Sequence, residues 1–419
     1  MLPQILVAQL GARRHYAVPC AFYSAGMLYE LHTDWCANIG LARWITKAVP
    51  RRFQPAPLRR LGQRLVPELP SDRIKTHPGL TLGLALGRKR HRGPAAQYQR
   101  YLRINAAFGQ QVVRHGFGKA NAVYGFNAAA LEIFQAARTL GLTTILDQTI
   151  APWAYVENLL HEERQQWPGW EENVPDAEDW GPLADREQAE WELADQIVCG
   201  SEFVVHAIQS QQGPSQRCHI VPHAVTLPGP RRERSFAADR PLRVLFVGTV
   251  ELRKGLPYLL EAAKLFGPHE AEFRVVGPVC LSRHAIELMA RRLDLRGRVS
   301  RREVAMHYRW ADVFVLPTLA EGSANVCYEA LAHGLPVITT FHAGSVIRNG
   351  TDGFLIPIRS SEAIADCLLQ LRCQPDRLAA LSEQARDRVS CFSIQRYQEQ
   401  LVAAVCSNRQ GSSQDTPDL

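Results

Sequence analysis

Short apolar runs alternate along the chain with longer segments in which apolar residues recur every three or four positions. The short runs are rich in Val, Ile and Leu, which is typical of buried strands, whereas the longer segments predict helices. The strands predicted in the first half of the chain are residues 4–9, 121–124, 143–146, 196–199 and 219–221. Those predicted in the second half are residues 243–247, 272–276, 313–316 and 336–339, with helices at about 255–266, at about 282–293 and from about 324.

This alternation of strands and helices predicts an α/β fold, in which helices cover both faces of parallel sheets. The pattern stops where Pro228, Gly229 and Pro230 follow one another, and then it starts again. We therefore predict two Rossmann-like domains that face each other across a cleft. The expected division is an N-terminal domain over residues 1–226, a linker over 227–240 and a C-terminal domain over 241–391.

Three further segments complete the predicted organisation. Residues 41–105 are rich in Pro and Arg and are interpreted as helices and loops inserted in the first domain. A helix at about 392–405 is expected to pack back on the first domain. The polar tail over residues 407–419 is expected to be disordered.

Composition indicates a globular protein. Hydrophobic residues make up 46% of the 419 residues and charged residues 21%. The 10 cysteines are scattered without a Cys-x-x-Cys pair, so the sequence predicts neither a structural zinc site nor a redox motif of that kind. No basic leader with a cleavage pattern and no apolar run of about 20 residues is found, and we expect a cytoplasmic protein.

Charge is unevenly distributed. Residues 1–120 contain 19 Lys and Arg against 4 Asp and Glu, whereas residues 157–192 are acidic. A basic half suggests a polyanionic partner, such as an anionic lipid at the inner membrane face or an anionic acceptor. The alternative is a solvated basic surface. Nucleic acid is not an expected partner, because the basic clusters occur without a recognisable binding module.

One strand-to-helix junction carries the strongest chemical signal. The strand that ends at Leu316 is followed by a loop with Glu321 and Gly322 and then by a helix that is expected to end at Gly334. The first turn of a helix offers unpaired N–H groups and a partial positive charge, which suit a pyrophosphate. Glu329 follows Glu321 by eight residues, so the two carboxylates lie at most about 12 Å apart along the helix axis.

A second junction of the same kind lies upstream. The strand over residues 243–247 ends at Gly248, and Arg253 and Lys254 precede the next helix. Cations at this position can stabilise a leaving diphosphate. The alternative is a solvated basic turn.

Together the two junctions resemble the retaining glycosyltransferases of family 4, which have the GT-B fold. That family has a strand-end glycine, a basic pair before a helix and a Glu-x7-Glu motif in this order. The resemblance covers about residues 190–390 and is weak in the N-terminal half.

The resemblance implies that the N-terminal domain binds the acceptor and that the C-terminal domain binds the donor. It also implies a role for each matching residue. Arg253 and Lys254 would bind the diphosphate of a nucleotide-sugar donor, Glu321 would contact the transferred sugar, and Glu329 would hold the ribose. Gly11 and Gly248 would let the chain approach the donor closely. The residues whose backbone would surround the phosphate are Gly322, Ser323, Ala324, Asn325 and Val326. No metal and no other cofactor is implied, and the expected catalytic residues are Glu321, Lys254 and Arg253.

The sequence also departs from the family. Thr249 stands where many relatives have arginine, and Arg253 is expected to replace it. Many relatives have a histidine near the sugar at the position that Asp147 or Gln148 occupies here. Asp147 is therefore either a sugar or acceptor contact or a helix cap or loop residue. His223, at the edge of the expected cleft, is either a loop histidine or a second such contact.

The predicted function is sugar transfer from a nucleotide diphosphate sugar to an acceptor, in the assembly of a cell-surface polysaccharide or glycolipid. Two alternatives remain open at this point. One is a nucleotide-sugar epimerase or hydrolase on the same fold, which would form product from the donor alone. The other is a non-catalytic nucleotide-sugar-binding protein. The base, the sugar and the acceptor are not indicated by the sequence.

Overall fold

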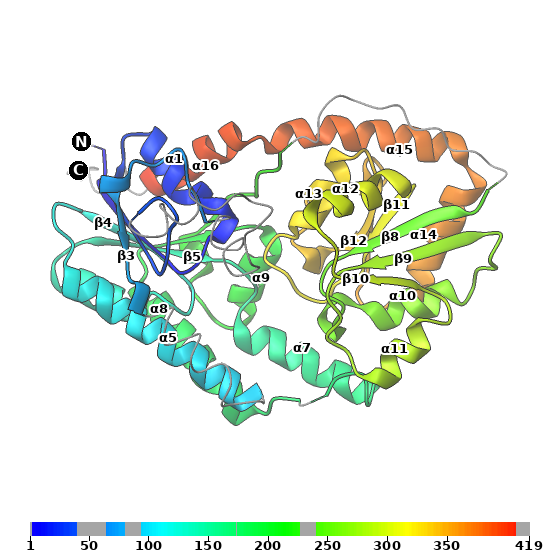
Figure 1. The fold of residues 1–419 in the computed structure, drawn as a ribbon, viewed down its shortest axis with the longest axis horizontal. Helices are drawn as coiled ribbons and strands as arrows, with labels where there is room; N and C mark the ends of the chain where they lie inside the picture. The colour runs from blue at the N-terminus through cyan, green and yellow to red at the C-terminus, as the bar shows by residue number, and fades with distance from the viewer. Residues whose placement is uncertain (1, 40–63, 80–93, 173, 227–239, 408–419) are drawn as a thin grey trace, which may run out of the picture.

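The structure is a computed structural model that describes residues 2–39, 64–79, 94–172, 174–226 and 240–407. Nearly all of the predicted linker and tail, and much of the basic segment over residues 41–105, lie outside the described residues. Within the described residues the chain forms two parallel sheets, one from each half, with helices on their faces (Figure 1).

The first sheet has seven parallel strands in the order β3-β2-β1-β4-β5-β6-β7. The strands are β1 (Ile5–Gln9), β2 (Leu28–Thr33), β3 (Ile74–Thr76), β4 (Ala122–Phe126), β5 (Thr143–Gln148), β6 (Gln196–Cys199) and β7 (Cys218–Ile220). Its helices are α1 (Ala17–Ser24), α5 (Pro94–His115), α6 (Leu131–Thr139), α7 (Trp153–Gln166), α8 (Ala177–Leu193) and α9 (Glu202–Ser210). The central strands β1 and β4 are buried along their whole length, as expected for strands that have helices on both faces.

The second sheet has six parallel strands in the order β10-β9-β8-β11-β12-β13. The strands are β8 (Leu242–Val247), β9 (Ala271–Val276), β10 (Asp294–Gly297), β11 (Val313–Leu316), β12 (Val337–Thr340) and β13 (Gly353–Ile356). Its helices are α10 (Leu256–Ala263), α11 (Arg283–Met289), α12 (Arg301–Trp310), α13 (Asn325–Ala332), α14 (Ser361–Cys373) and α15 (Pro375–Arg388). In both sheets the strand order reverses beside the first strand, which is where such sheets bind ligands at their carboxyl ends.

The nine predicted strands are all present, with ends that differ by a few residues at most. The pattern did not reveal β2, β3, β10 and β13. These strands lie at or next to the edges of the sheets, and β10 alternates exposed and half-buried positions. A partly exposed strand such as β10 gives a weak apolar signal, whereas β13 is apolar and mostly buried but only four residues long.

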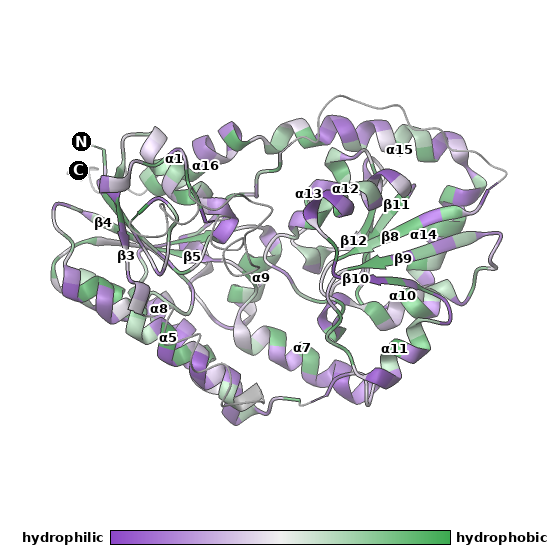
Figure 2. Cartoon of the chain, viewed as in Figure 1, coloured by the Kyte–Doolittle hydropathy of each residue, from purple (hydrophilic) through white to green (hydrophobic). Residues whose placement is uncertain are grey.

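Apolar packing joins the two halves. The core of the second sheet also includes Ala151, Val156, Leu160 and Phe203 from the first half of the chain. The strands of both sheets are mainly hydrophobic, whereas outer helices such as α7 alternate hydrophobic and hydrophilic residues along their length (Figure 2).

The last described helix, α16 (Ile394–Cys406), returns to the first sheet and lies beside α1 (Figure 1). Tyr397, Leu401 and Val405 of α16 are buried in the core of that sheet. No described helix has both the length and the apolar composition that crossing a membrane requires.

Candidate active site

The loop between β11 and α13 brings Glu321 against the basic pair. The Glu321 carboxylate accepts hydrogen bonds from Lys254 Nζ and from Thr318 Oγ1, the latter at 3.3 Å. Arg253 Nη1 lies 3.1 Å from the same carboxylate oxygen. Three residues that the sequence placed at two separate junctions therefore meet at one point.

Local structure explains why the basic pair points to this loop. Arg253 and Lys254 belong to a 3-10 turn, η5 (Leu252–Lys254), which ends at Gly255 with φ of 71°. A Cβ atom at Gly255 would lie 2.0 Å from the carbonyl oxygen of Pro317, so both the backbone angle and the close approach require glycine. The Arg253 carbonyl accepts from the Leu319 N–H at 2.8 Å, which joins the two loops through their backbones.

The charged groups are held in fixed positions. Arg253 donates to the Ala320 carbonyl and to Glu251 Oε1, each at 2.6 Å. Burial, followed by repulsion from Arg253, lowers the pKa of Lys254 to about 7. The contact with the Glu321 carboxylate favours the charged form of Lys254. Arg253 is a cation in these partly dry surroundings, and a bound anion would favour the charged form of Lys254 as well.

The same loop docks on the first domain. The Ala151 N–H donates to the Glu321 carbonyl at 3.2 Å, and Ser201 Oγ donates to the Gly322 carbonyl at 2.5 Å. A Cβ atom at Gly322 would lie 1.9 Å from the Thr149 carbonyl oxygen. Gly322 is thus required by the contact between the domains, whereas the sequence suggested it for close approach of a ligand.

The start of α13 is only partly free for an anion. Its N-cap residue, Ala324, makes no side-chain hydrogen bond to the first turn. The Ala324 N–H itself donates to the Ala343 carbonyl at 2.9 Å, so this predicted phosphate donor is already engaged. The Ser323 hydroxyl bonds to Tyr328 and to the Gly344 carbonyl. The N–H groups of the first helical turn, from Asn325 onward, are the better candidates.

Glu329 lies on α13 one turn further on. Its Oε2 atom accepts from the Tyr308 hydroxyl at 3.0 Å. Asn325, which is exposed, carries a side-chain oxygen 2.8 Å from His223 Nδ1. Val326 between them is half-buried, and its carbonyl accepts from Tyr308 at 3.4 Å.

These residues share a cavity of about 360 Å³ with the first loop of the chain. Glu329, Asn325 and His223 line it from one side, and Arg14 and His15 line it from the loop after β1. Its size is that of an ordinary small-molecule pocket. Figure 1 shows that α1, α16 and α13, which surround this cavity, lie along one side of the molecule.

Arg14 and His15 were not among the site residues predicted from the sequence. Both belong to the 3-10 turn η1 (Arg13–Tyr16) and have left-handed backbone angles, with φ of 47° and 51°. Non-glycine residues in this region are uncommon and concentrate at functional sites. The basic run Arg13-Arg14-His15, which begins two residues after Gly11, was the available signal.

The two predicted glycines of the strand ends do not line this cavity. Gly11 has a left-handed φ of 72°, and its N–H donates to Asp34 Oδ1 at 2.9 Å. Gly248 follows β8, and its N–H donates to the Val276 carbonyl at 3.0 Å. A Cβ atom at Gly277 would lie 1.8 Å from the Gly248 carbonyl oxygen, so the ends of β8 and β9 are in close contact.

Asp147 is neither a helix cap nor a loop residue, because it lies inside strand β5. Its fully buried carboxylate accepts two hydrogen bonds from Arg14, at 3.0 and 3.2 Å, and one from the Tyr124 hydroxyl at 2.7 Å. These contacts fix the Arg14 guanidinium at the wall of the cavity. The adjacent Gln148 is also buried and bonds to Glu187 and Trp191.

His223 is buried next to α13. Its main-chain N–H donates to the Tyr328 hydroxyl at 3.2 Å, and its ring stacks on the Tyr328 ring. Burial, followed by repulsion from Arg14, lowers the pKa of His223 to about 3. The imidazole is therefore neutral near pH 7, and its place in the cavity suits hydrogen bonding more than proton transfer.

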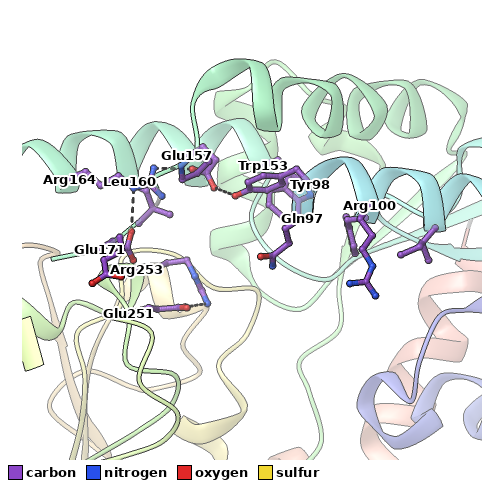
Figure 3. A pocket seen from close by; sticks show the side chains of 14 residues that line it. Gln97, Tyr98, Arg100, Trp153, Glu157, Leu160, Arg164, Glu171, Glu251 and Arg253 are labelled. Carbon is purple, nitrogen blue, oxygen red and sulfur yellow. Dashed lines mark hydrogen bonds and ion pairs between the residues drawn. The ribbon is translucent and has the colours of Figure 1, made fainter. Parts of the chain in front are cut away.

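A second, larger cavity of about 860 Å³ extends from Arg253 and Glu251 to α5 and α7. The aromatic residues Tyr98, Tyr101 and Trp153 line it, with ring centroids 5.7 Å apart for Tyr98–Trp153 and 6.1 Å apart for Tyr101–Trp153. Figure 3 shows Tyr98 and Trp153 grouped on the helices, with Glu251 and Arg253 on the loop after β8.

Carboxylates and arginines alternate around this second cavity. Tyr98 donates to Glu157 at 2.9 Å, and Arg164 bonds to Glu157 at 3.2 Å and to Glu171 at 3.3 Å. Aromatic faces beside carboxylates that can accept from hydroxyl groups suit a polyhydroxylated ligand.

The chain is similar in sequence to known glycosyltransferases. Residues 241–373 match the family described as "Glycosyl transferases group 1". The chain is 31% identical over 237 residues to the D-inositol 3-phosphate glycosyltransferase of Geodermatophilus obscurus, covering 50% of this chain and 52% of that protein. It is 29% identical over 150 residues to the amylovoran biosynthesis glycosyltransferase AmsK of Erwinia amylovora, covering 32% and 37%. The chain spans about half the length of the curated relatives it matches.

Solved structures match the chain over nearly its whole length. Anabaena Alr3699/HepE in complex with UDP and glucose superimposes with a TM-score of 0.61 at 12% identity, covering 97% of this chain and 100% of that chain. Sucrose-phosphate synthase from Thermosynechococcus elongatus superimposes with a TM-score of 0.64 at 16% identity, covering 98% and 100%. The predicted fold class is confirmed: the chain has the two-domain α/β fold of GT-B glycosyltransferases.

Proposed function

We propose that this chain is a glycosyltransferase that moves a sugar from a nucleoside diphosphate sugar to an acceptor with retention of configuration. The observation that carries the proposal is the convergence of Lys254, Arg253 and Glu321 at the carboxyl end of the second sheet. Two cations there would bind the donor diphosphate and stabilise the charge that it gains as the glycosidic bond breaks.

The carboxylate would act on the sugar. In the absence of donor, Glu321 neutralises Lys254 and Arg253. A bound diphosphate would take over these cations, which frees Glu321 to accept hydrogen bonds from the sugar hydroxyls. Glu329 would hold the ribose, as the resemblance to the retaining family 4 implies, and that resemblance is also the ground for proposing retention.

Two features support a nucleotide donor and a metal-independent reaction. The Anabaena neighbour is described as a complex with UDP, which makes a uridine nucleotide the first donor to test. The positive charge that a metal would bring to the diphosphate is already present on Arg253 and Lys254 and at the start of α13.

The larger cavity is the proposed acceptor site. It begins at Arg253, beside the proposed leaving group, and its aromatic walls suit a sugar or another polyhydroxylated acceptor. This room for an acceptor favours transfer over an epimerase, a hydrolase or a non-catalytic binder. The name of the amylovoran relative supports a role in polysaccharide assembly. We also propose that the basic N-terminal half, in the cytoplasm, contacts an anionic membrane face.

The test is donor binding followed by turnover. A thermal-shift screen with UDP-, ADP- and GDP-sugars should show a rise in unfolding temperature with one of them, because a ligand at 100 times its dissociation constant adds about 2.7 kcal/mol. Release of nucleoside diphosphate should then require an added acceptor and persist in EDTA. Product from donor alone would favour the hydrolase or epimerase, and activity restored to a chelated sample only by Mg²⁺ or Mn²⁺ would contradict the proposed mechanism.

A further inference from the structure

A cluster of three histidines and one glutamate lies at the edge of the first sheet, apart from the proposed active site. Glu30 and His32 are two positions apart on β2, so their side chains lie on one face of the sheet. His77 follows the end of β3, and His115 is the last residue of α5. Three elements that are distant in sequence thus contribute to one group, which we name the His–Glu cluster.

Two ring nitrogens of the His–Glu cluster converge on one carboxylate oxygen. His32 Nε2 lies 2.9 Å from Glu30 Oε2, and His115 Nε2 lies 3.3 Å from the same oxygen. The ligand atoms of these three residues all lie within 4.8 Å of one another. In a tetrahedral zinc site with bonds of 2.0–2.1 Å, neighbouring ligand atoms are about 3.3 Å apart, so the observed spacing is close to that of a metal site.

The ligand side chains also have the hydrogen-bond partners that usually orient metal ligands. His32 Nδ1 lies 3.1 Å from His77 Nε2, and a ligand histidine needs such a partner on its second nitrogen to fix its tautomer and orientation. The second oxygen, Glu30 Oε1, pairs with Lys75 Nζ at 3.4 Å, which leaves Oε2 for the ion.

The burial of the ligand side chains and the access of solvent to them also suit the binding of a metal ion. The His32 side chain is fully buried and the Glu30 side chain is 13% exposed, whereas His115 is 40% exposed. The ligands are therefore held in place, and solvent can reach the site past His115. That open side leaves a coordination position for water.

We propose that Glu30, His32 and His115 bind one divalent transition-metal ion of the zinc type, with His77 as the positioning residue of His32. In the metal-bound form His32 is the neutral tautomer that carries its one proton on Nδ1 and donates it in a hydrogen bond to His77 Nε2, which leaves the Nε2 lone pair for the ion. The ion joins β2 to the last residue of α5. Tyr98, at the wall of the larger cavity, lies on the same helix roughly 25 Å away along the axis, so the ion would stabilise the helix that carries this wall.

The experiment is a calorimetric titration of the full chain, freed of metal by chelation and dialysis, with Zn²⁺ and separately with Mg²⁺. The wild type should bind one equivalent of Zn²⁺ and little Mg²⁺, because two imidazoles and one carboxylate favour zinc. His115→Ala should lose this equivalent, and His77→Ala should weaken it roughly 10–100-fold. His161→Ala, which removes an exposed histidine outside the cluster, should match the wild type.

A second measurement tests whether the metal binds at the His–Glu cluster or at cysteines. Co²⁺ in the site should give a spectrum of nitrogen and oxygen ligands without a thiolate charge-transfer band. Zn²⁺ should raise the unfolding temperature of the wild type but not that of His115→Ala. Equal stoichiometry and affinity for the wild type and His115→Ala, a thiolate band, or no Zn²⁺ binding by the wild type would each overturn the proposal. None of these outcomes bears on the glycosyltransferase assignment.

Discussion

The Ser201 hydroxyl donates a 2.5 Å hydrogen bond to the carbonyl of Gly322, and this bond joins the two domains next to the proposed catalytic carboxylate. Ser201 also caps helix α9, because its Oγ atom accepts a hydrogen bond from the Val204 N–H at 3.4 Å. The loop that carries Glu321 is thus part of the interdomain contact, so its position depends on how the domains meet.

Gly322→Ala tests this contact. The added Cβ would lie 1.9 Å from the Thr149 carbonyl, a backbone atom that no side-chain rotation can move away. We expect a loss of stability of about 1–3 kcal/mol in chemical denaturation and loss of sugar transfer. Gly181→Ala is the control, because that glycine has open space around it. Wild-type stability and activity in Gly322→Ala would show that the domains do not meet in this way.

The second prediction concerns Asp147. Removing its charge in Asp147→Asn leaves the Arg14 guanidinium without its buried partner, so the variant should lose about 3–5 kcal/mol of unfolding free energy. Removing both charges in Arg14→Met/Asp147→Leu should recover most of this stability. If Asp147→Asn instead keeps its stability but raises the KM for donor or acceptor, then Asp147 is a substrate contact.

The structural role of Asp147 could not be predicted from the sequence. Its position after an apolar run suggested a loop or a cap, because one sequence does not show that a strand continues past its last apolar residue. The partner that explains the residue, Arg14, lies 133 positions earlier. The contact between Lys254 and Glu321 could be predicted, because the two residues follow the neighbouring parallel strands β8 and β11, whose carboxyl ends lie at the same edge of the sheet.

The contacts between the two domains were harder to predict from the sequence. The small loop residues Gly322 and Ser323 were interpreted as room for a phosphate, but the structure packs Gly322 against Thr149 and Ser323 against Gly200 of the first domain. Close packing between domains and close approach of a ligand both select small residues, so a single sequence does not separate them.

The third prediction concerns the ribose. If Glu329 binds both ribose hydroxyls, Glu329→Ala should cost about 1.5–3 kcal/mol of nucleotide affinity, whereas a 2′,3′-dideoxy nucleotide should bind the variant and the wild type equally. Glu287→Ala, at an exposed carboxylate of α11, is the matched control. Unchanged affinity of Glu329→Ala for the parent nucleotide would remove Glu329 from the donor site.

The fourth prediction concerns the basic N-terminal half. Binding to anionic phosphatidylglycerol vesicles should exceed binding to neutral phosphatidylcholine vesicles and should weaken steeply with salt. Charge reversal at Arg88, Lys89 and Arg90 should reduce it more than the same change at three arginines of the C-terminal domain, Arg283, Arg291 and Arg292. Equal binding to both vesicles, or none to either, would support a solvated basic surface.

The most direct measurement is a calorimetric titration of the wild type, Lys254→Ala, Glu321→Gln and the control Lys264→Ala with UDP, ADP and GDP. Lys254 contributes a charged contact to the diphosphate, so Lys254→Ala should bind the preferred nucleotide roughly ten- to a hundredfold more weakly. Glu321→Gln should bind it at least as tightly as the wild type, because Glu321 contacts the sugar that a free nucleoside diphosphate lacks and its charge no longer competes for Lys254 and Arg253. Lys264→Ala should match the wild type. Equal affinity of Lys254→Ala and the wild type, or no binding of any of the three nucleotides, would contradict the donor site proposed here.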